Sequence, residues 1–230
     1  MVIEKGKYSA PHCTILIDNH GSKVLILDKQ NQLPELAFDK ISQAKIQDSD
    51  VVYFDFCPAK HTLAMAKIAK NLGKKIVLNF QQNLSTTVKQ GDISVEDIWQ
   101  TIALTDIFIP SRKAAIDLCG GEEDPYQQLK ILSQKTNGDV VLTVGSKGII
   151  AYSSKSGVVK KIDGFKINPV DTTGAGDALI GSLLYFYLEE KMDLFNALKL
   201  SNVAAALTCL KVGAQQRVTI SNIKQFLKDQ

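Results

Sequence analysis

The sequence predicts an α/β protein built around a largely parallel β-sheet. Short, uninterrupted apolar runs alternate with longer segments that carry the start and stop signals of helices. The apolar runs lack the alternation of half-exposed strands, which indicates strands covered on both faces. The chain has 230 residues, 45% of them hydrophobic, so it can bury a sizeable core without disulfides or metals.

The first segment with strand character does not follow this alternation. Residues 13–28 hold two β-rich runs around turn residues 19–22, a pattern typical of a β-hairpin. We expect this hairpin, within about residues 8–30, to stand apart from the main sheet as a small lobe.

The middle of the chain then repeats a strand followed by a helix. Pro58 and Gly73 delimit one helix, and Ser94 with Asp97 forms a capping-box pattern at the start of another. No internal repeat, linker or low-complexity segment appears, which favours a single domain over residues 1–230. The predicted strands are 51–56, 74–80, 106–110 and two within 139–154; the predicted helices are 58–73, 94–104, 111–120, 125–138, 178–190, 193–210 and 221–229.

Composition argues against several classes of function. Lys and Arg number 27 against 24 Asp and Glu, and these basic residues are scattered, unlike those of a nucleic-acid or membrane-binding surface. The three histidines and four cysteines show neither metal-ligand spacing nor a CxxC pair. Neither a signal peptide nor a membrane-spanning run is visible, so we expect a cytoplasmic protein without nucleic-acid or membrane partners.

The most informative stretch is DTTGAGDALIGSLLY, residues 171–185. The turn formed by Gly174, Ala175 and Gly176 leaves the first N–H groups of an apolar helix open to a ligand. Together with the helix dipole, these amides favour a phosphate. Asp177 would repel that anion, but it has a purpose if it takes a proton from an attacking hydroxyl during phosphoryl transfer. The alternative is an acidic first-turn residue on an ordinary buried helix.

This string resembles the C-terminal signature of the ribokinase-like, PfkB-type carbohydrate kinases. The stretch LTVGSKGIIAY is similar to the family's strand–turn–strand over the nucleotide phosphates, and SNVAAALTCLKVGAQ to the helix and loop beside the adenine. The hairpin near residues 14–28 is similar to the end of the β-clasp lid that covers the sugar. The positions that match the family's nucleotide-binding pattern are Thr143, Gly145, Gly148, Asn202 and Gly213.

The resemblance implies a three-layer, ribokinase-like α/β/α fold with a mostly parallel central sheet and the hairpin as a lid remnant. It implies ATP-dependent phosphoryl transfer to a hydroxyl of a sugar or nucleoside, with Asp177 as general base. The amides of residues 174–177 would form the anion hole. ATP and Mg²⁺ are the implied cofactors, and Asp171 with Thr173 resembles the family's monovalent-cation positions, which implies K⁺.

Departures from the family pattern leave a second hypothesis open. The chain begins at the lid, without the family's N-terminal segment and its sugar-gripping Gly-Gly loop, and residues 111–114 replace an Asn-x-x-Glu motif that helps place Mg²⁺. Asn79 stands where the family has an aspartate, and Arg217 where a small residue is common. The chain is therefore either a working sugar or nucleoside kinase, or a degenerate or truncated kinase fold. The latter would bind nucleotide without efficient turnover, as a regulatory or interaction module.

The sequence also predicts self-association. Without a first core strand, one edge or face of the sheet would be left exposed, and an exposed apolar edge promotes association. We therefore expect a homo-oligomer, with the hairpin strands as the candidate interface. The identity of the acceptor does not follow from the sequence, because this fold accommodates many hydroxylated rings.

Overall fold

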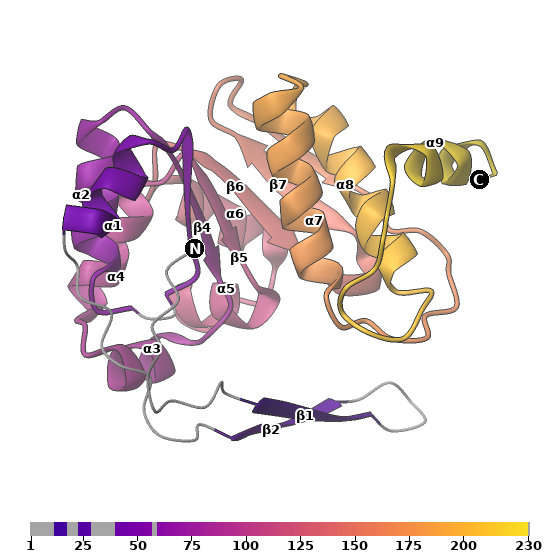
Figure 1. The fold of residues 1–230 in the computed structure, drawn as a ribbon, viewed down its shortest axis with the longest axis horizontal. Helices are drawn as coiled ribbons and strands as arrows, with labels where there is room; N and C mark the ends of the chain where they lie inside the picture. The colour runs from indigo at the N-terminus through magenta and orange to yellow at the C-terminus, as the bar shows by residue number, and fades with distance from the viewer. Residues whose placement is uncertain (1–11, 18–22, 29–39, 57–58, 230) are drawn as a thin grey trace.

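The computed structural model describes residues 12–17, 23–28, 40–56 and 59–229, and its centre is a six-stranded sheet (Figure 1). The strand order is β3-β4-β5-β6-β7-β8. The first four strands are parallel, whereas the last two form antiparallel pairs at one side. The predicted, mostly parallel sheet is thus confirmed. The strands are β3 (Val51–Phe54), β4 (Lys75–Phe80), β5 (Ile107–Pro110), β6 (Asp139–Thr143), β7 (Ile149–Ser153) and β8 (Val158–Ile162).

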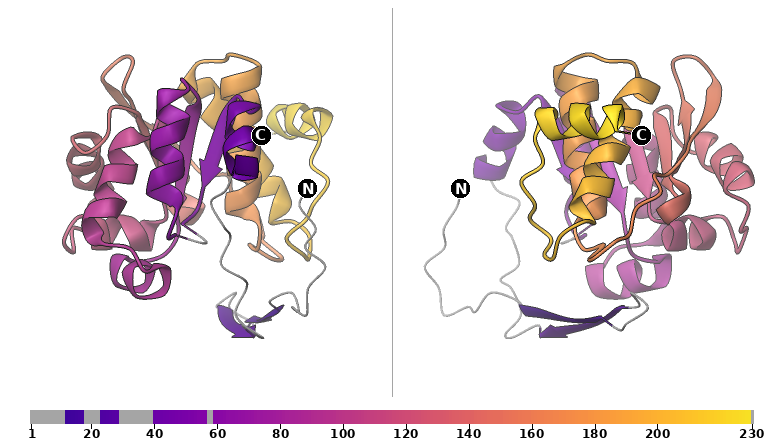
Figure 2. Two further views of the ribbon diagram at one scale, coloured as in Figure 1. Left: turned by 60° about the vertical axis from the view of Figure 1, so that its left-hand side comes forward. Right: turned by 90° about the vertical axis from the view of Figure 1, so that its right-hand side faces the viewer.

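Helices cover both faces of this sheet and give three layers (Figures 1 and 2). One layer contains α1 (Lys40–Gln47), α2 (Thr62–Asn71), α4 (Val95–Leu104), α5 (Arg112–Leu118) and α6 (Pro125–Ser133). The other contains α7 (Ala175–Leu183), the π-helical turn η2 (Leu184–Glu189), α8 (Leu194–Thr208) and α9 (Ile220–Lys228). Two short helices, α3 (Leu84–Gly91) and η1 (Gly145–Lys147), follow β4 and β6.

Each face of the sheet has its own hydrophobic core. Along β4, Ile76 and Leu78 pack against the α2–α6 layer, whereas Val77 packs against the α7–α8 layer. This alternation follows from the two-residue period of a strand. It explains why the central strands are continuous apolar runs, since both of their faces are buried.

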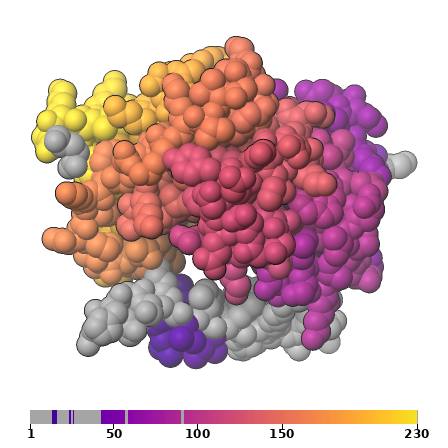
Figure 3. Space-filling view, turned by 180° about the vertical axis from the view of Figure 1, so that it is seen from behind, coloured from indigo at the N-terminus to yellow at the C-terminus, as the bar shows by residue number. Residues whose placement is uncertain are grey.

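The predicted hairpin is present as β1 (His12–Ile17) and β2 (Lys23–Asp28), an antiparallel pair. It lies apart from the main sheet, beyond the carboxyl ends of β4 and β5, where α3 and α5 follow these strands (Figure 1). From behind, its indigo strands lie at the lower margin of the molecule, below the main body (Figure 3). The predicted turn at 19–22 is outside the described residues.

Several elements differ from the sequence prediction. The helices α1 and α3 and the strand β8 were not predicted. In α3, Asn83 caps the helix by accepting a hydrogen bond from Thr86 N, and this cap outweighs the poor helix propensity of the threonines that follow. Strand β8 is an exposed edge that carries two lysines, as edge strands often do.

Two further local features bear on the predictions. The capping box of Ser94 and Asp97 is confirmed at the start of α4. The predicted helix 178–190 widens into a π-helical turn, in which Glu190 N donates to Tyr185 O.

Within the described part of the chain, no helix is both long enough and apolar enough to span a membrane.

Candidate active site

The glycine-rich turn before α7 has a backbone that only glycine suits. Gly174 is the N-cap of α7 and has a left-handed φ of 81°. A Cβ at this position would lie 2.3 Å from the carbonyl oxygen of Ala214, far inside van der Waals contact. Gly174 therefore permits both the sharp turn and the close approach of the loop that follows α8.

The turn leaves backbone donors open at the start of α7. The first helical hydrogen bond runs from Ala178 N to Gly174 O, at 2.9 Å. The amides of Gly176 and Asp177 precede the residues that can bond within the helix, and neither has a hydrogen-bond acceptor among the described residues. Asp177 itself is exposed. An exposed carboxylate thus stands directly beside a helix N-terminus with open amides, an arrangement that suits an anion.

Asp171 holds this loop in place. It is buried, and its two carboxylate oxygens accept hydrogen bonds from Thr173 N at 2.9 Å and from Gly213 N at 3.0 Å. The loop before α7 and the loop after α8 are therefore joined by a charge-assisted pair of bonds. Gly213 has a left-handed φ of 100°, a conformation that favours glycine.

The glycines after β6 form a second tight turn. Gly145 and Gly148 have φ values of 62° and 94°, and Val144 N donates to Gly148 O. A Cβ on Gly148 would lie 2.1 Å from Ile162 O at the end of β8. The turn that follows Thr143 is therefore packed against the backbone that leaves β8.

Asn202 joins α8 to the same segment. It is buried on α8, and its side-chain amide donates to Asp163 O at 2.9 Å. Strand β8 runs parallel to β6, because each is antiparallel to β7. Residues 143–148, Asp163 and Asn202 thus gather at the carboxyl edge of the sheet, where ligands bind in open parallel sheets.

A third group lies at the carboxyl ends of β3 and β4. Asn79 is buried and donates from Nδ2 to Tyr53 Oη at 2.9 Å, while Gln81 Nε2 donates to Asn79 Oδ1 at 2.6 Å. Burial raises the pKa of Tyr53, the Asn79 hydrogen bond lowers it, and the carboxylates of Asp55 and Asp177 raise it further. Tyr53 is therefore close enough to Asp177 to be affected by its charge.

Sequence reasoning noted Asn79 but missed Tyr53 and Asp55. The available signal was polar side chains at the ends of two consecutive apolar strands. Because carboxyl ends of neighbouring parallel strands meet at one edge, such residues lie together. Here Tyr53 lies near the end of β3, Asp55 directly follows this strand, and Asn79 lies near the end of β4.

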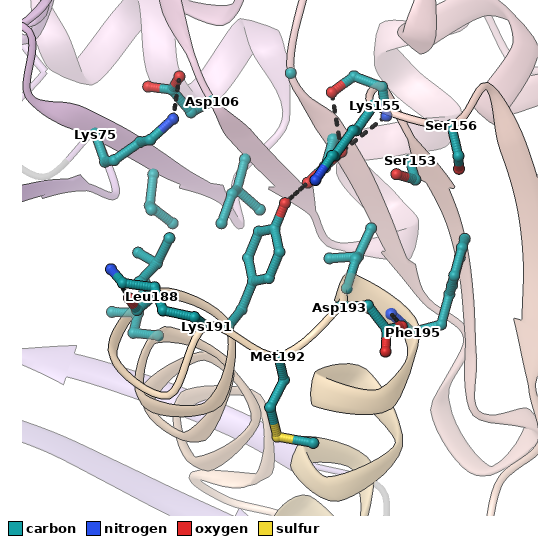
Figure 4. Close-up of a pocket in the computed structure, with 18 of the residues that line it drawn as sticks. Lys75, Asp106, Ser153, Lys155, Ser156, Leu188, Lys191, Met192, Asp193 and Phe195 are labelled. Atoms are coloured by element: carbon teal, nitrogen blue, oxygen red, sulfur yellow. Dashed lines mark hydrogen bonds and ion pairs between the residues drawn. The ribbon is translucent and has the colours of Figure 1, made fainter.

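A large hollow of about 1330 Å³ lies at the opposite edge of the sheet (Figure 4). It opens beside Lys75 and Asp106, near the amino ends of β4 and β5. Within it, Tyr187 donates to Asp139 at 2.8 Å, and burial followed by this bond raises the Tyr187 pKa. None of the predicted site residues lines this hollow, so it is separate from the loop before α7.

The fold is an α/β fold whose site combines two glycine turns with the open N-terminus of α7. The pfkB family carbohydrate kinase model matches residues 1–220, and the chain belongs to this family. The chain is 29% identical over 216 residues to ribokinase of Haemophilus influenzae, covering 91% of this chain and 66% of that protein. It is 28% identical over 217 residues to ribokinase of Lactococcus lactis, covering 93% and 65%.

Solved structures show the same fold. A putative ribokinase from Agrobacterium tumefaciens superposes with a TM-score of 0.80 at 23% identity, covering 96% of this chain and 68% of that one. Ribokinase from Thermotoga maritima gives 0.74 at 22% identity, covering 95% and 69%. The predicted ribokinase-like fold and family are thus confirmed. The chain spans about two thirds of the length of the curated ribokinases that it matches.

Proposed function

We propose that this chain carries out ATP-dependent phosphoryl transfer to a hydroxyl of a sugar or nucleoside-like molecule. Membership of the carbohydrate kinase family supports the reaction class. The observation that carries the proposal is the start of α7, where the exposed Asp177 carboxylate adjoins the open amides of Gly176 and Asp177. A base and an anion hole on one turn suit phosphoryl transfer to an alcohol, because the base can accept the hydroxyl proton while the amides bind the phosphoryl group.

In this proposal each part of the turn has a distinct role. The amides at the start of α7 bind the transferring phosphoryl group, and the helix dipole stabilises its charge. Asp177 accepts the proton of the attacking hydroxyl. Gly174 permits the turn, and Asp171 keeps it joined to Gly213.

The nucleotide would lie along the carboxyl edge near β6 and β8. Gly145 and Gly148 bring no side chain to this turn, and Asn202 fixes the neighbouring segment through Asp163 O. A structural neighbour, a putative ribokinase II from E. coli, is described in complex with ATP and Mg²⁺. Thr143 at the end of β6 completes the proposed nucleotide-binding set.

The described residues offer little to a metal ion by themselves. Among them, no group of three or more His, Cys, Asp or Glu side chains is arranged to hold a metal. In the proposed reaction Mg²⁺ would be held mainly by phosphate oxygens and water, where it would neutralise phosphate charge. K⁺ near Asp171 and Thr173 remains a prediction; because both Asp171 oxygens accept backbone N–H bonds, backbone carbonyls would have to supply most ligands.

A second candidate function is nucleotide binding without efficient turnover. The observation that favours it is the start of α5. Ser111 is the N-cap of this helix and accepts a hydrogen bond from Ala114 N. Arg112 and Lys113 are exposed in the first turn of α5, and this turn contains no carboxylate that could hold a Mg²⁺ hydration shell. A chain of this kind would act as a regulatory or interaction module.

We further propose that the chain forms a homo-oligomer. Leu16, Val24 and Ile26 lie on one face of the hairpin and are 55%, 60% and 53% exposed. Within the described residues, β3 pairs with β4 only, so its other edge is open. An apolar face and an open edge both favour association with a second copy.

The base assignment is tested by Asp177→Asn. The amide cannot take the hydroxyl proton, so turnover should fall on the order of a hundred- to ten-thousand-fold. Nucleotide affinity should be kept or improved, because a negative charge beside the phosphate is removed. The assay is phosphoryl transfer from labelled ATP to a panel of sugars and nucleosides.

The matched control is Asp48→Asn, an exposed aspartate between α1 and β3, at the amino edge of the sheet. It should leave turnover unchanged. Wild-type turnover in Asp177→Asn would refute the base assignment. A wild-type chain that binds ATP but phosphorylates no acceptor would favour the second candidate function.

A further inference from the structure

The amino edge of the sheet carries polar side chains on a face that is otherwise apolar. Val141 on β6 and Ala151 on β7 pack in the core beneath α7 and α8. Side chains two residues apart share one face of a strand, so Asp139 and Ser153 face the same way. Both are buried, at 3% and 6% exposure, and both line the hollow of about 1330 Å³. Buried polar groups normally have hydrogen-bond partners, so the contacts of each decide what it does.

Asp139 is accounted for by contacts within the protein. Its Oδ1 accepts hydrogen bonds from Ser154 N at 2.8 Å and from Ser154 Oγ at 3.0 Å. Its Oδ2 accepts a hydrogen bond from Tyr187 Oη at 2.8 Å. These bonds join the turn after β7 and the π-helical turn η2 to the start of β6. The Asp139 charge is therefore stabilised by donors of the protein itself.

Ser153 has no comparable contact. Within the described residues, its hydroxyl has neither a hydrogen-bond donor nor an acceptor as partner. No fully enclosed side-chain oxygen or nitrogen in this part of the chain lacks a partner, so the Ser153 hydroxyl must reach the hollow that the residue lines (Figure 4). A serine hydroxyl can donate one hydrogen bond and accept two. Ser153 therefore offers an otherwise buried polar group to a ligand.

Two lysines lie beside this hydroxyl. Ser153 pairs with Val158, and Lys160 follows two residues later on the same face of β8, so Ser153 and Lys160 are diagonal neighbours, about 7–8 Å apart. Lys155 lies in the turn, two residues after Ser153 (Figure 4). Among the described residues neither lysine forms an ion pair. The ammonium of Lys160 lies 4.7 Å from the centroid of the Phe195 ring.

The carboxylates that line the hollow are engaged by other groups or lie away from these lysines. Asp193 caps α8 by accepting hydrogen bonds from two backbone N–H groups, both at 3.1 Å. Asp106 pairs with a lysine of β4 at 3.4 Å. Asp50 lies beside β3, four strand spacings or about 19 Å from β7. Glu189 is exposed at the end of η2, where Lys191 follows it. The part of the hollow beside β7 and β8 therefore suits an anion.

The neighbouring walls suit an apolar group. Val158 lies directly across from Ser153 and is 40% exposed, and Phe195 reaches Lys160 at the same end of the hollow. Binding sites for small molecules are typically apolar cavities with a few polar groups at fixed positions. The hollow is also lined by Val77, Ile107, Leu184 and Leu188.

We propose that this hollow binds a small organic anion, whose carboxylate or phosphate head is held by the Ser153 hydroxyl and the ammonium groups of Lys155 and Lys160. Its apolar body would lie beside Val158 and Phe195. The site is separate from the proposed nucleotide site, which lies at the other end of β6, about 13 Å away along the strand. The inference goes beyond the proposed function and does not depend on it.

The test measures the binding of defined probes by isothermal titration calorimetry. Octanoate and octyl phosphate are the two anionic probes, whereas octanol and protonated octylamine carry the same chain without a negative charge. At least one anionic probe should bind, and more tightly than octanol or octylamine. Ser153→Ala should weaken its affinity about three- to tenfold, and Lys160→Gln about ten- to a hundredfold, the usual effects of a neutral and of a charged hydrogen bond.

The matched control is Lys135→Gln. Lys135 also lies over an aromatic ring, 5.6 Å from the centroid of Trp99, but in the layer on the other face of the sheet. This change should leave probe affinity unchanged, and urea unfolding checks that each variant is folded. The inference is overturned if neither anionic probe binds, if octanol or octylamine binds as tightly, or if either folded variant of the hollow binds like the wild type.

ATP separates this inference from the proposed function. The anionic probe should bind equally well with and without saturating ATP and Mg²⁺, and displacement by ATP would overturn the inference. ATP binding, seen as a thermal shift, without any probe binding would refute the inference alone. Probe binding by a chain that ATP does not stabilise would support the inference and refute the kinase proposal.

Discussion

Replacing Gly174 by alanine should weaken both the fold and the phosphate site. A non-glycine residue at φ 81° costs about 1–2 kcal/mol in backbone strain. The new Cβ would also lie 2.3 Å from Ala214 O, a backbone atom that must move by about 1 Å to reach ordinary contact. That movement strains the neighbouring bond from Gly213 N to Asp171, which is worth about 1–2 kcal/mol.

The expected loss for Gly174→Ala is therefore about 2–4 kcal/mol in the free energy of unfolding, a large share of a typical total. Urea unfolding measures it, and the thermal shift with ATP should shrink in parallel. Gly176→Ala is the matched control, because Gly176 has a helical backbone and no atom lies within 4 Å of the position that its new Cβ would occupy. This control should be neutral or stabilising by up to about 1 kcal/mol. Equal stability of the two variants would refute the reasoning.

Three more predictions follow from single contacts. Asp171→Asn should cost about 1–3 kcal/mol in urea unfolding, because an amide accepts only one of the two backbone N–H bonds; an unchanged midpoint would contradict this. Hydrogen bonds from Ser94 lower the Asp97 pKa below 3.8, so the stability advantage of the wild type over Asp97→Ala should be full above pH 4 and disappear as the pH falls through the lowered value. Leu16→Lys and Val24→Lys should reduce the mass measured by light scattering, and an unchanged oligomer would exclude the hairpin face.

The parts of the site that depend on local backbone could be predicted from the sequence. The sequence predicted turns at Gly174, Gly145 and Gly148, and in the structure each of these glycines has a positive φ. Another backbone segment also approaches two of them, Gly174 and Gly148, closely. The capping box at Ser94 was likewise predictable, since its two partners are three residues apart. Local conformational requirements of this kind are expressed in residue type and spacing.

The parts that depend on strand alignment could not be predicted. Tyr53 and Asn79 are 26 residues apart and meet only because β3 and β4 pair in parallel with one register. The double role of Asp171, which bonds to Gly213 across 42 residues, is also absent from any local pattern. Sequence reasoning assigned Asp171 to a monovalent-cation site, which stays a prediction, and it did not foresee that the Asp171 carboxylate joins two loops.

The central claim is that the start of α7 binds the phosphate of a nucleotide that is to be transferred. The most direct test is a crystal structure with Mg²⁺ and a non-hydrolysable ATP analogue. The account predicts the terminal phosphate within about 3 Å of the amides of Gly176 and Asp177, with the glycine turn at 145–148 along the nucleotide. A nucleotide bound instead in the hollow beside Lys75 and Asp106, with the start of α7 left open, would contradict it.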